Sequence, residues 1–139
     1  MATILITGSN KGIGMAAAIA FGKAGHNVAA TMRNPALATE LMNAINSEKL
    51  PIKVFQLDVD SDESVSSTIQ KITKEMGPID VLVNNAGIER LGPVEEVAIS
   101  DYRKVMETNY FGVIRCVQAV LPEMRKRKSG CIINIASVA

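Results

Sequence analysis

The chain has 139 residues, of which 47% are hydrophobic and 21% charged, with 15 Lys and Arg against 14 Asp and Glu. The length suits one domain, and the composition excludes a disordered tail, a collagen-like repeat and a low-complexity segment. A net charge of +1 and the absence of Trp argue against nucleic acid and an anionic membrane as partners.

The sequence also predicts a cytoplasmic protein. No apolar run approaches the roughly 20 residues that a membrane-spanning helix needs. Residues 1–7 lack the basic and long apolar regions of a signal peptide. Cys116 and Cys131 have no paired spacing, so we expect both to be reduced packing residues. One His and two dispersed Cys predict no metal site.

Five short apolar runs predict buried strands. In chain order they are residues 3–7 (TILIT), 27–31 (NVAAT), 52–57 (IKVFQL), 79–83 (IDVLV) and 131–135 (CIINI). They are almost continuously apolar rather than alternating, which is typical of strands that are covered on both faces of a sheet.

Segments of helical periodicity separate these strands. The first helix begins near Ile13 and ends at Gly25, and the second begins at Asn34-Pro35, where Asn caps a helix and Pro suits its first position. Asp60 or Ser61 caps the third helix, and the fourth covers residues 100–126 and ends in a basic run. The predicted apolar faces of the last three helices are Leu37, Leu41 and Ile45; Val65, Ile69, Ile72 and Met76; and Tyr102, Met106, Asn109, Val113, Val117, Val120 and Met124.

Strands that alternate with helices imply right-handed crossovers and a parallel sheet with helices on both faces. The fold class is therefore expected to be α/β, with a doubly wound parallel sheet in a single domain over residues 1–139.

A glycine-rich turn follows the first strand. Gly8, Gly12 and Gly14 remove side chains at a helix N-terminus, where free N–H groups and the helix dipole favour a phosphate. The spacing G-x3-G-x-G differs from the G-x-G-x-x-G of many dinucleotide sites. Taken alone, the pattern leaves a tight turn without a ligand open. Its place after the first strand favours a dinucleotide.

Three motifs together carry a family resemblance. In this order and separation, residues 7–14 (TGSNKGIG), 84–87 (NNAG) and 130–139 (GCIINIASVA) resemble the short-chain dehydrogenase/reductase family over the whole chain. The resemblance implies a Rossmann fold, with strand order 3-2-1-4-5 for the part present. It also implies a nicotinamide cofactor and the interconversion of a small-molecule carbonyl and a secondary alcohol by hydride transfer. A homo-oligomer that packs partly through the helix at residues 100–126 is implied as well.

The resemblance assigns cofactor-binding positions one by one. They are Gly8, Gly12, Ile13 and Gly14 at the pyrophosphate, Asp58 and Val59 at the adenine, and Asn85, Ala86 and Gly87 along the adenosine and ribose. Asn84 is expected to tie its strand to the neighbouring strands.

Two residues are candidates for catalysis. Asn109 places an amide within an apolar helix face, so it is expected to be buried and specifically hydrogen-bonded. It is either a structural residue or, as the family implies, the holder of a water in a proton relay. Ser137 is either an ordinary loop residue or, by resemblance, the serine that hydrogen-bonds the substrate carbonyl.

The family's proton donor, a Tyr followed four residues later by Lys, is absent. Met follows Tyr102 at that spacing and Ile follows Tyr110, and both tyrosines precede Ser137. We therefore expect the N-terminal part of a longer domain. The 139 residues alone should be inactive, and poorly soluble through an apolar edge strand. The alternative is a dinucleotide-binding or sensing module without chemistry.

The end of the second strand predicts which cofactor binds. Sites for NAD place an acidic residue there to hold the ribose hydroxyls, but this chain has Arg33, and its first acidic residue is Glu40. Lys11 adds a second cation from the glycine-rich turn, with Ser9 and Asn10 as neutral donors. NADP(H) is therefore predicted over NAD(H).

Overall fold

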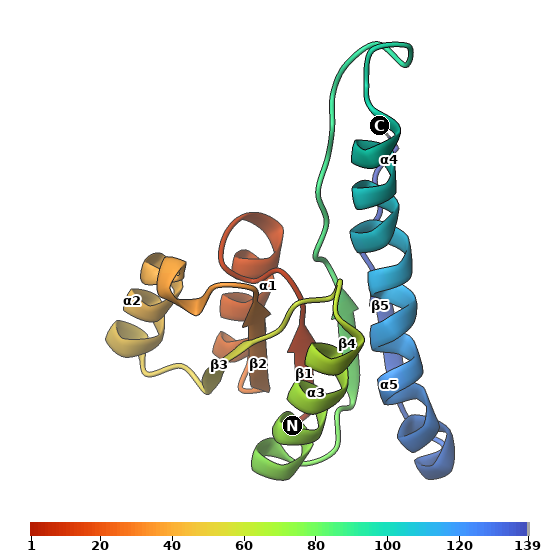
Figure 1. The fold of residues 1–139 in the computed structure, drawn as a ribbon. Coiled ribbons are helices and arrows are strands. Elements are labelled where there is room, and N and C mark those ends of the chain that lie inside the picture. The colour runs from red at the N-terminus through yellow and green to blue at the C-terminus, as the bar shows by residue number, and fades with distance from the viewer. Residues whose placement is uncertain (139) are drawn as a thin grey trace.

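The computed structural model describes residues 1–138, in which five parallel strands form one sheet with helices on both faces (Figure 1). The strands are β1 (Thr3–Ile6), β2 (Asn27–Met32), β3 (Ile52–Gln56), β4 (Val81–Asn84) and β5 (Cys131–Asn134). Their order is β3-β2-β1-β4-β5. The doubly wound sheet and its strand order are thus confirmed.

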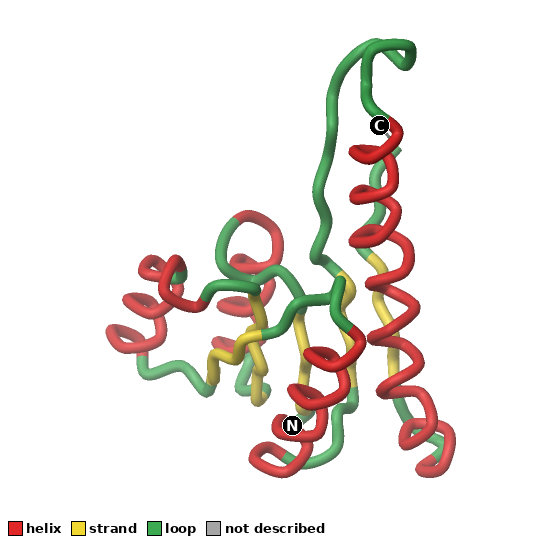
Figure 2. Tube along the Cα trace, in the orientation of Figure 1, coloured by secondary structure: helices red, strands yellow, loops and turns green. Residues whose placement is uncertain are grey.

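The helices cover the sheet in two layers, and Figure 2 shows how they alternate with strands along the chain. They are α1 (Gly12–Lys23), α2 (Thr39–Glu48), α3 (Asp62–Met76), α4 (Ile99–Met106) and α5 (Gly112–Arg127). Successive side chains of β1 enter different cores: Ile4 and Ile6 pack with α1 and α2, and Leu5 packs with α3 and α5. Both faces of the sheet are therefore buried.

The second predicted helix is divided in two. Asn34 does act as a cap, because its side chain accepts a hydrogen bond from the Ala36 N–H at 3.2 Å, but it caps only the 3-10 turn η1 (Pro35–Leu37). Helix α2 begins after the fully buried Ala38, whose ψ of 37° takes the chain out of the helical path. Leu37 is 68% exposed, so its predicted place on the buried face is wrong.

The fourth predicted helix is continuous but irregular. It runs through α4, a π-helical turn η2 (Glu107–Phe111) and α5. Its buried residues are Thr108, Gly112, Cys116, Val120 and Met124. The predicted face is wrong for Tyr102, Met106 and Asn109, which are exposed. The π-helical turn adds a residue and rotates the face, and α4 extends beyond the sheet (Figure 1).

Strand β5 forms one edge of the sheet in the part of the chain that the structure describes. Ile133 and Ile135 there are 37% and 42% exposed. Cys116 is buried as expected, but Cys131 is exposed because it lies on this edge, so its predicted packing role is wrong. Within residues 1–138, no helix combines the length and the apolar character needed to cross a membrane.

Candidate functional site

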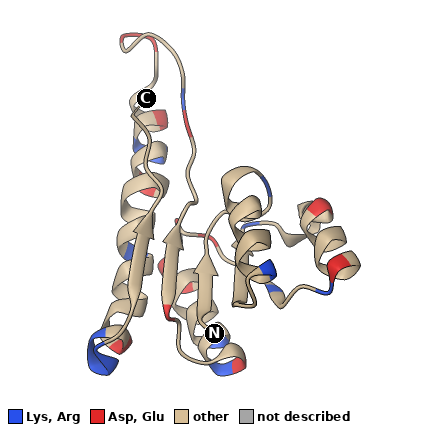
Figure 3. Cartoon of the chain, turned by 180° about the vertical axis from the view of Figure 1, so that it is seen from behind, with Lys and Arg blue, Asp and Glu red and all other residues tan. Residues whose placement is uncertain are grey.

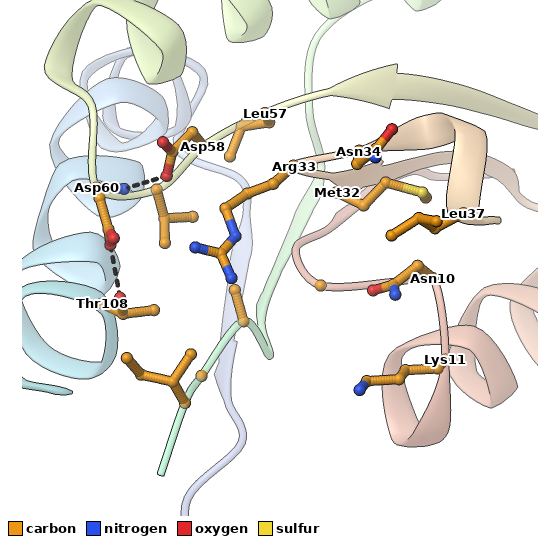
Figure 4. A pocket seen from close by; sticks show the side chains of 15 residues that line it. Asn10, Lys11, Met32, Arg33, Asn34, Leu37, Leu57, Asp58, Asp60 and Thr108 are labelled. Carbon is orange, nitrogen blue, oxygen red and sulfur yellow. Dashed lines mark hydrogen bonds between the residues drawn. The ribbon is translucent and has the colours of Figure 1, made fainter. Parts of the chain in front are cut away.

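A cavity of about 390 Å³ lies where the strands β1, β2, β3 and β4 end (Figure 4). Sheets of this kind bind ligands beyond the carboxyl ends of their strands, at the point where the strand order reverses. Here that point lies between β1 and β4. The lining residues are Gly8, Asn10, Lys11, Met32, Arg33, Asn34, Leu37, Leu57, Asp58, Val59, Asp60, Ala86, Gly87, Ile88 and Thr108.

The glycine-rich turn is closed on its inner side and open on its outer side. A Cβ on Gly14 would lie 2.2 Å from the Gly8 carbonyl oxygen, and a Cβ on Gly8 would lie 2.8 Å from the Ala86 Cα. Gly12 instead has a φ of +58° and open space where its Cβ would be. The turn therefore packs tightly against the protein and leaves room for a ligand at its outer surface.

The N-terminus of α1 can bind an anion. Lys11 is its N-cap residue, no side chain among the described residues caps it, and its first turn contains no acidic residue. The first N–H groups of a helix have no partner within the helix and carry the positive end of its dipole. Ile13, on this first turn, is 65% exposed.

Two cations face this cavity. Figure 4 shows the side chains of Lys11 and Arg33 pointing into it from different elements. Among the residues that the structure describes, neither forms an ion pair with an acidic side chain. Ser9, by contrast, is fully buried: its hydroxyl donates to the Ile6 carbonyl and its N–H to the Thr31 carbonyl, so it supports the turn from inside.

The opposite wall is the β3–α3 loop (residues 57–61), which carries two acidic residues. The Asp60 N–H donates to the Asp58 carboxylate at 3.0 Å, and the Thr108 hydroxyl donates to the Asp60 carboxylate at 2.7 Å. Figure 4 shows both bonds. The charges of the cavity are thus divided, with cations on the α1 and β2 side and carboxylates on the α3 side. From the sequence, Asp60 is predicted only as an alternative cap of the third helix, a role that Ser61 fills by accepting a hydrogen bond from the Ser64 N–H. Its contact with Thr108 is not predicted, because it joins residues 48 positions apart.

The start of the β4–α4 loop (residues 85–98) is tied to the glycine-rich turn. The Thr7 hydroxyl accepts hydrogen bonds from the N–H groups of Asn85 and Ala86, at 3.0 and 2.9 Å. The Asn85 side chain donates to the Gly8 carbonyl at 3.0 Å. Thr7 is almost completely buried, and its role was missed, although a hydroxyl at the end of an apolar strand is a signal that it must find partners.

Asn109 is exposed, so the expectation of a buried amide is wrong, but the expectation of specific hydrogen bonds is confirmed. Its Oδ1 accepts from the Ile88 N–H and its Nδ2 donates to the Ile88 carbonyl, both at 2.8 Å. The π-helical turn brings the amide out to this loop instead of into the core. Asn109 therefore fixes the backbone of the loop where it leaves the cavity.

Ser137 lies on the exposed segment that follows β5 and does not line the cavity. The expected tie from Asn84 is confirmed, because its side chain donates to the Asn134 side chain at 2.9 Å and these two residues are register partners in β4 and β5.

Comparison with known proteins gives consistent matches. The family model described as short chain dehydrogenase matches residues 2–139. Human retinol dehydrogenase 8 is 42% identical over 141 residues, which is 98% of this chain and 44% of that protein. Gluconate 5-dehydrogenase of Gluconobacter oxydans is 36% identical and is aligned over 99% of this chain and 54% of its own length.

Solved structures agree with these matches. A gluconate 5-dehydrogenase from Burkholderia cenocepacia, in complex with NADP and tartrate, superposes with a TM-score of 0.89 at 36% identity, covering 99% of this chain and 54% of that one. A short-chain dehydrogenase from Streptomyces avermitilis has the same TM-score at 34% identity, over 98% of this chain and 49% of that one. The chain thus spans about half the length of the relatives it matches.

Proposed function

The chain belongs to the short-chain dehydrogenase family, and we propose that it forms the cofactor-binding part of an NADP(H)-dependent enzyme that interconverts a carbonyl and a secondary alcohol. The observation that carries the proposal is the pair of cations, Lys11 and Arg33, that faces the cavity without acidic partners among the described residues. The relatives that this chain matches include two dehydrogenases named for small molecules, retinol and gluconate.

The residues around the cavity fit a dinucleotide. The open outer side at Gly12, beside the uncapped N-terminus of α1, suits the pyrophosphate. Asp58 and Val59 would hold the adenine, and the backbone of residues 85–87 would follow the adenosine and its ribose. When bound, the nicotinamide supplies or accepts the hydride, and the protein supplies position and proton transfer.

Charge explains the proposed preference for NADP(H). The end of β2 offers Arg33 in place of an acidic residue, so nothing there repels a 2′-phosphate. A guanidinium binds a phosphate through two parallel hydrogen bonds, and the Lys11 ammonium adds a second charge. Each such contact contributes about 1.5–3 kcal/mol before salt screening. Asn10 adds a neutral donor from the same turn.

Asn109 and Ser137 are the residues of this chain proposed to act in catalysis. The Ser137 hydroxyl would donate a hydrogen bond to the substrate carbonyl oxygen. One lone pair of the Asn109 Oδ1 and one N–H of its Nδ2 are used by Ile88, which leaves one acceptor site and one donor for a water. Asn109 would thus hold the loop and a water of the proton relay together.

The 139 residues contain no Tyr followed four positions later by Lys, which is the pair that would donate the proton to the substrate. We infer that residues 1–139 form the N-terminal part of a longer catalytic domain and have no turnover alone. The share of the relatives that the chain covers, about half, supports this inference.

Assembly and compartment belong to the same proposal. Tyr102, Met106, Tyr110 and Phe111 expose 37–50% of their surfaces along α4 and η2, which suits packing against a second copy in a homo-oligomer. The free cysteines suit a reducing compartment such as the cytoplasm.

Equilibrium binding of NADP⁺ and NAD⁺ to the intact protein tests the cofactor. The wild type should bind NADP⁺ about tenfold more tightly or better, as one charge-assisted contact implies, and Arg33→Asp should abolish this ratio. Lys126→Asp makes the same change of net charge at an exposed position outside the cavity and should preserve it. Equal affinities in the wild type, or an unchanged ratio in Arg33→Asp, would contradict the proposal.

A further inference from the structure

Arg115 on α5 connects three segments around the cavity without facing the cavity itself. Its guanidinium forms ion pairs with Glu107, on the π-helical turn, and with Asp62, at the first position of α3. A third hydrogen bond goes from Nη1 to the Val59 carbonyl at 3.0 Å. Only 21% of the Arg115 side chain is exposed.

These contacts hold the β3–α3 loop against the helix. Val59 lies in that loop, and its side chain packs on Gly112 so closely that a Cβ on Gly112 would be 2.8 Å from the Val59 Cγ2. The Thr108 hydroxyl reaches Asp60 from the same helix, one turn before Gly112. The acidic wall of the cavity thus rests on one helical surface, and Arg115 supplies its charged contact.

The charge of Arg115 is secure. Burial lowers the pKa of its guanidinium, but hydrogen bonds and the negative charges of Asp62 and Glu107 raise it by more, so the net shift is upward. Without this cation, Asp62 and Glu107 would lose the partner that they share, although Asp62 is 88% exposed and Glu107 40% exposed. The Val59 carbonyl would lose its donor.

We propose that Arg115 is a positioning residue of the cofactor cavity, which holds the β3–α3 loop in the shape that binds the adenosine half of the dinucleotide. The proposal rests on the function proposed above. It assigns to Arg115 no contact with the cofactor or substrate. Its effect is transmitted through the Val59 carbonyl and through Asp62, which follows the loop directly.

The chain offers a matched control in Arg127. Its guanidinium also pairs with an acid, Asp80 at 3.1 Å, and also donates to a backbone carbonyl, Ile79 at 3.0 Å. Its side chain is 26% exposed, close to the value for Arg115. Both partners precede β4, so this network lies at the amino ends of the strands, away from the cavity. Figure 3 shows the Lys and Arg residues gathered at this end of α5.

The test compares Arg115→Met, Arg115→Lys and Arg127→Met in the intact protein. Melting temperatures report stability. Calorimetry well below those temperatures reports the dissociation constants of NADP⁺, NAD⁺ and adenosine 2′,5′-bisphosphate, which lacks the nicotinamide half. Both Met variants should melt below the wild type, because Glu107 loses its ion pair with Arg115 and Asp80 its ion pair with Arg127, and both carboxylates are partly shielded from solvent.

Of the two Met variants, only Arg115→Met should weaken binding, by about tenfold, the size of one lost hydrogen bond to a charged group. The factor should be the same for NADP⁺ and for adenosine 2′,5′-bisphosphate, because the loop lies on the adenosine side. The affinity of Arg115→Lys should lie between those of the wild type and Arg115→Met, since an ammonium keeps the charge but cannot form the two parallel hydrogen bonds of a guanidinium. The ratio of NADP⁺ to NAD⁺ affinity should stay at its wild-type value, because Lys11 and Arg33 are unchanged.

Wild-type affinity in Arg115→Met, or an equal loss of affinity in Arg127→Met, would overturn the proposal and leave Arg115 a role in stability alone. The affinities of the wild type for NADP⁺ and NAD⁺ test the proposed cofactor separately. If it prefers NAD⁺, the proposed cofactor is wrong, and the comparison of Arg115 with Arg127 is decided by NAD⁺ binding. If it binds neither dinucleotide, both proposals fail.

Discussion

Replacing Gly14 by alanine should destabilise the protein by placing a methyl group inside the backbone of the glycine-rich turn. The added Cβ would lie 2.2 Å from the Gly8 carbonyl oxygen and 2.5 Å from the Asn85 Nδ2. Gly8 O belongs to the backbone, and Asn85 is held there by its own hydrogen bond to that oxygen. The Gly8 oxygen can move only with the backbone, and moving the Asn85 amide breaks its hydrogen bond. We therefore expect a loss of about 3 kcal/mol, the upper range for overpacking, from a domain stability of roughly 5–15 kcal/mol.

Gly12→Ala is the matched control for this experiment. Nothing lies within 4 Å of its added Cβ, so only the φ of +58° opposes the substitution, at a cost of about 1 kcal/mol. Urea denaturation of the intact protein should therefore rank Gly14→Ala clearly below Gly12→Ala. Binding of NADP⁺ should fall in Gly12→Ala by more than its stability implies, because the methyl group enters the open side proposed for the pyrophosphate. A Gly14→Ala protein as stable as Gly12→Ala would refute the steric argument.

Three further outcomes follow from single contacts. Gly112→Ala should lower the melting temperature and weaken NADP⁺ binding together, because its methyl group would displace Val59; unchanged binding would show that the loop tolerates the shift. Asn84→Ala should cost about 1 kcal/mol in urea denaturation, and a double-mutant cycle with Asn134→Ala should show coupling if their 2.9 Å bond matters. Burial raises the pKa of the Cys116 thiol from 9.0 to about 12. Between these pH values the thiol ionises only in the unfolded state, so the free energy of unfolding should fall as the pH rises through this range. Cys116→Ala should remove that part of the pH dependence.

The sheet could be predicted from the sequence because its strands have a simple pattern. Consecutive residues such as Ile4, Leu5 and Ile6 are all apolar, so both faces of the strand are apolar. This pattern indicates a parallel sheet between two helical layers. The glycine-rich turn could be found for a similar reason, since Gly8 and Gly14 stand where any side chain would collide with backbone. Both the strands and the turn are thus determined by residues that are adjacent in the sequence.

The errors arose where distant packing decides the structure. A uniform helical period predicts the wrong face for the fourth helix, because the π-helical turn at residues 107–111 shifts that period and turns Asn109 toward Ile88. At the break between η1 and α2, Ala38 is fully buried in the core that β2 and α2 form, and the local sequence does not indicate this packing. The contact of Arg115 with Val59 joins residues 56 positions apart, and no local pattern announces it.

A crystal structure of the intact protein with bound NADP⁺ would show whether Arg33, which follows β2, and Lys11, the N-cap residue of α1, hold the 2′-phosphate. We expect 2′-phosphate oxygens within about 3.2 Å of the Arg33 guanidinium or the Lys11 ammonium, and the pyrophosphate against the first N–H groups of α1. A 2′-phosphate that lies in solvent, with both cations turned away from it, would show that these residues do not select NADP(H).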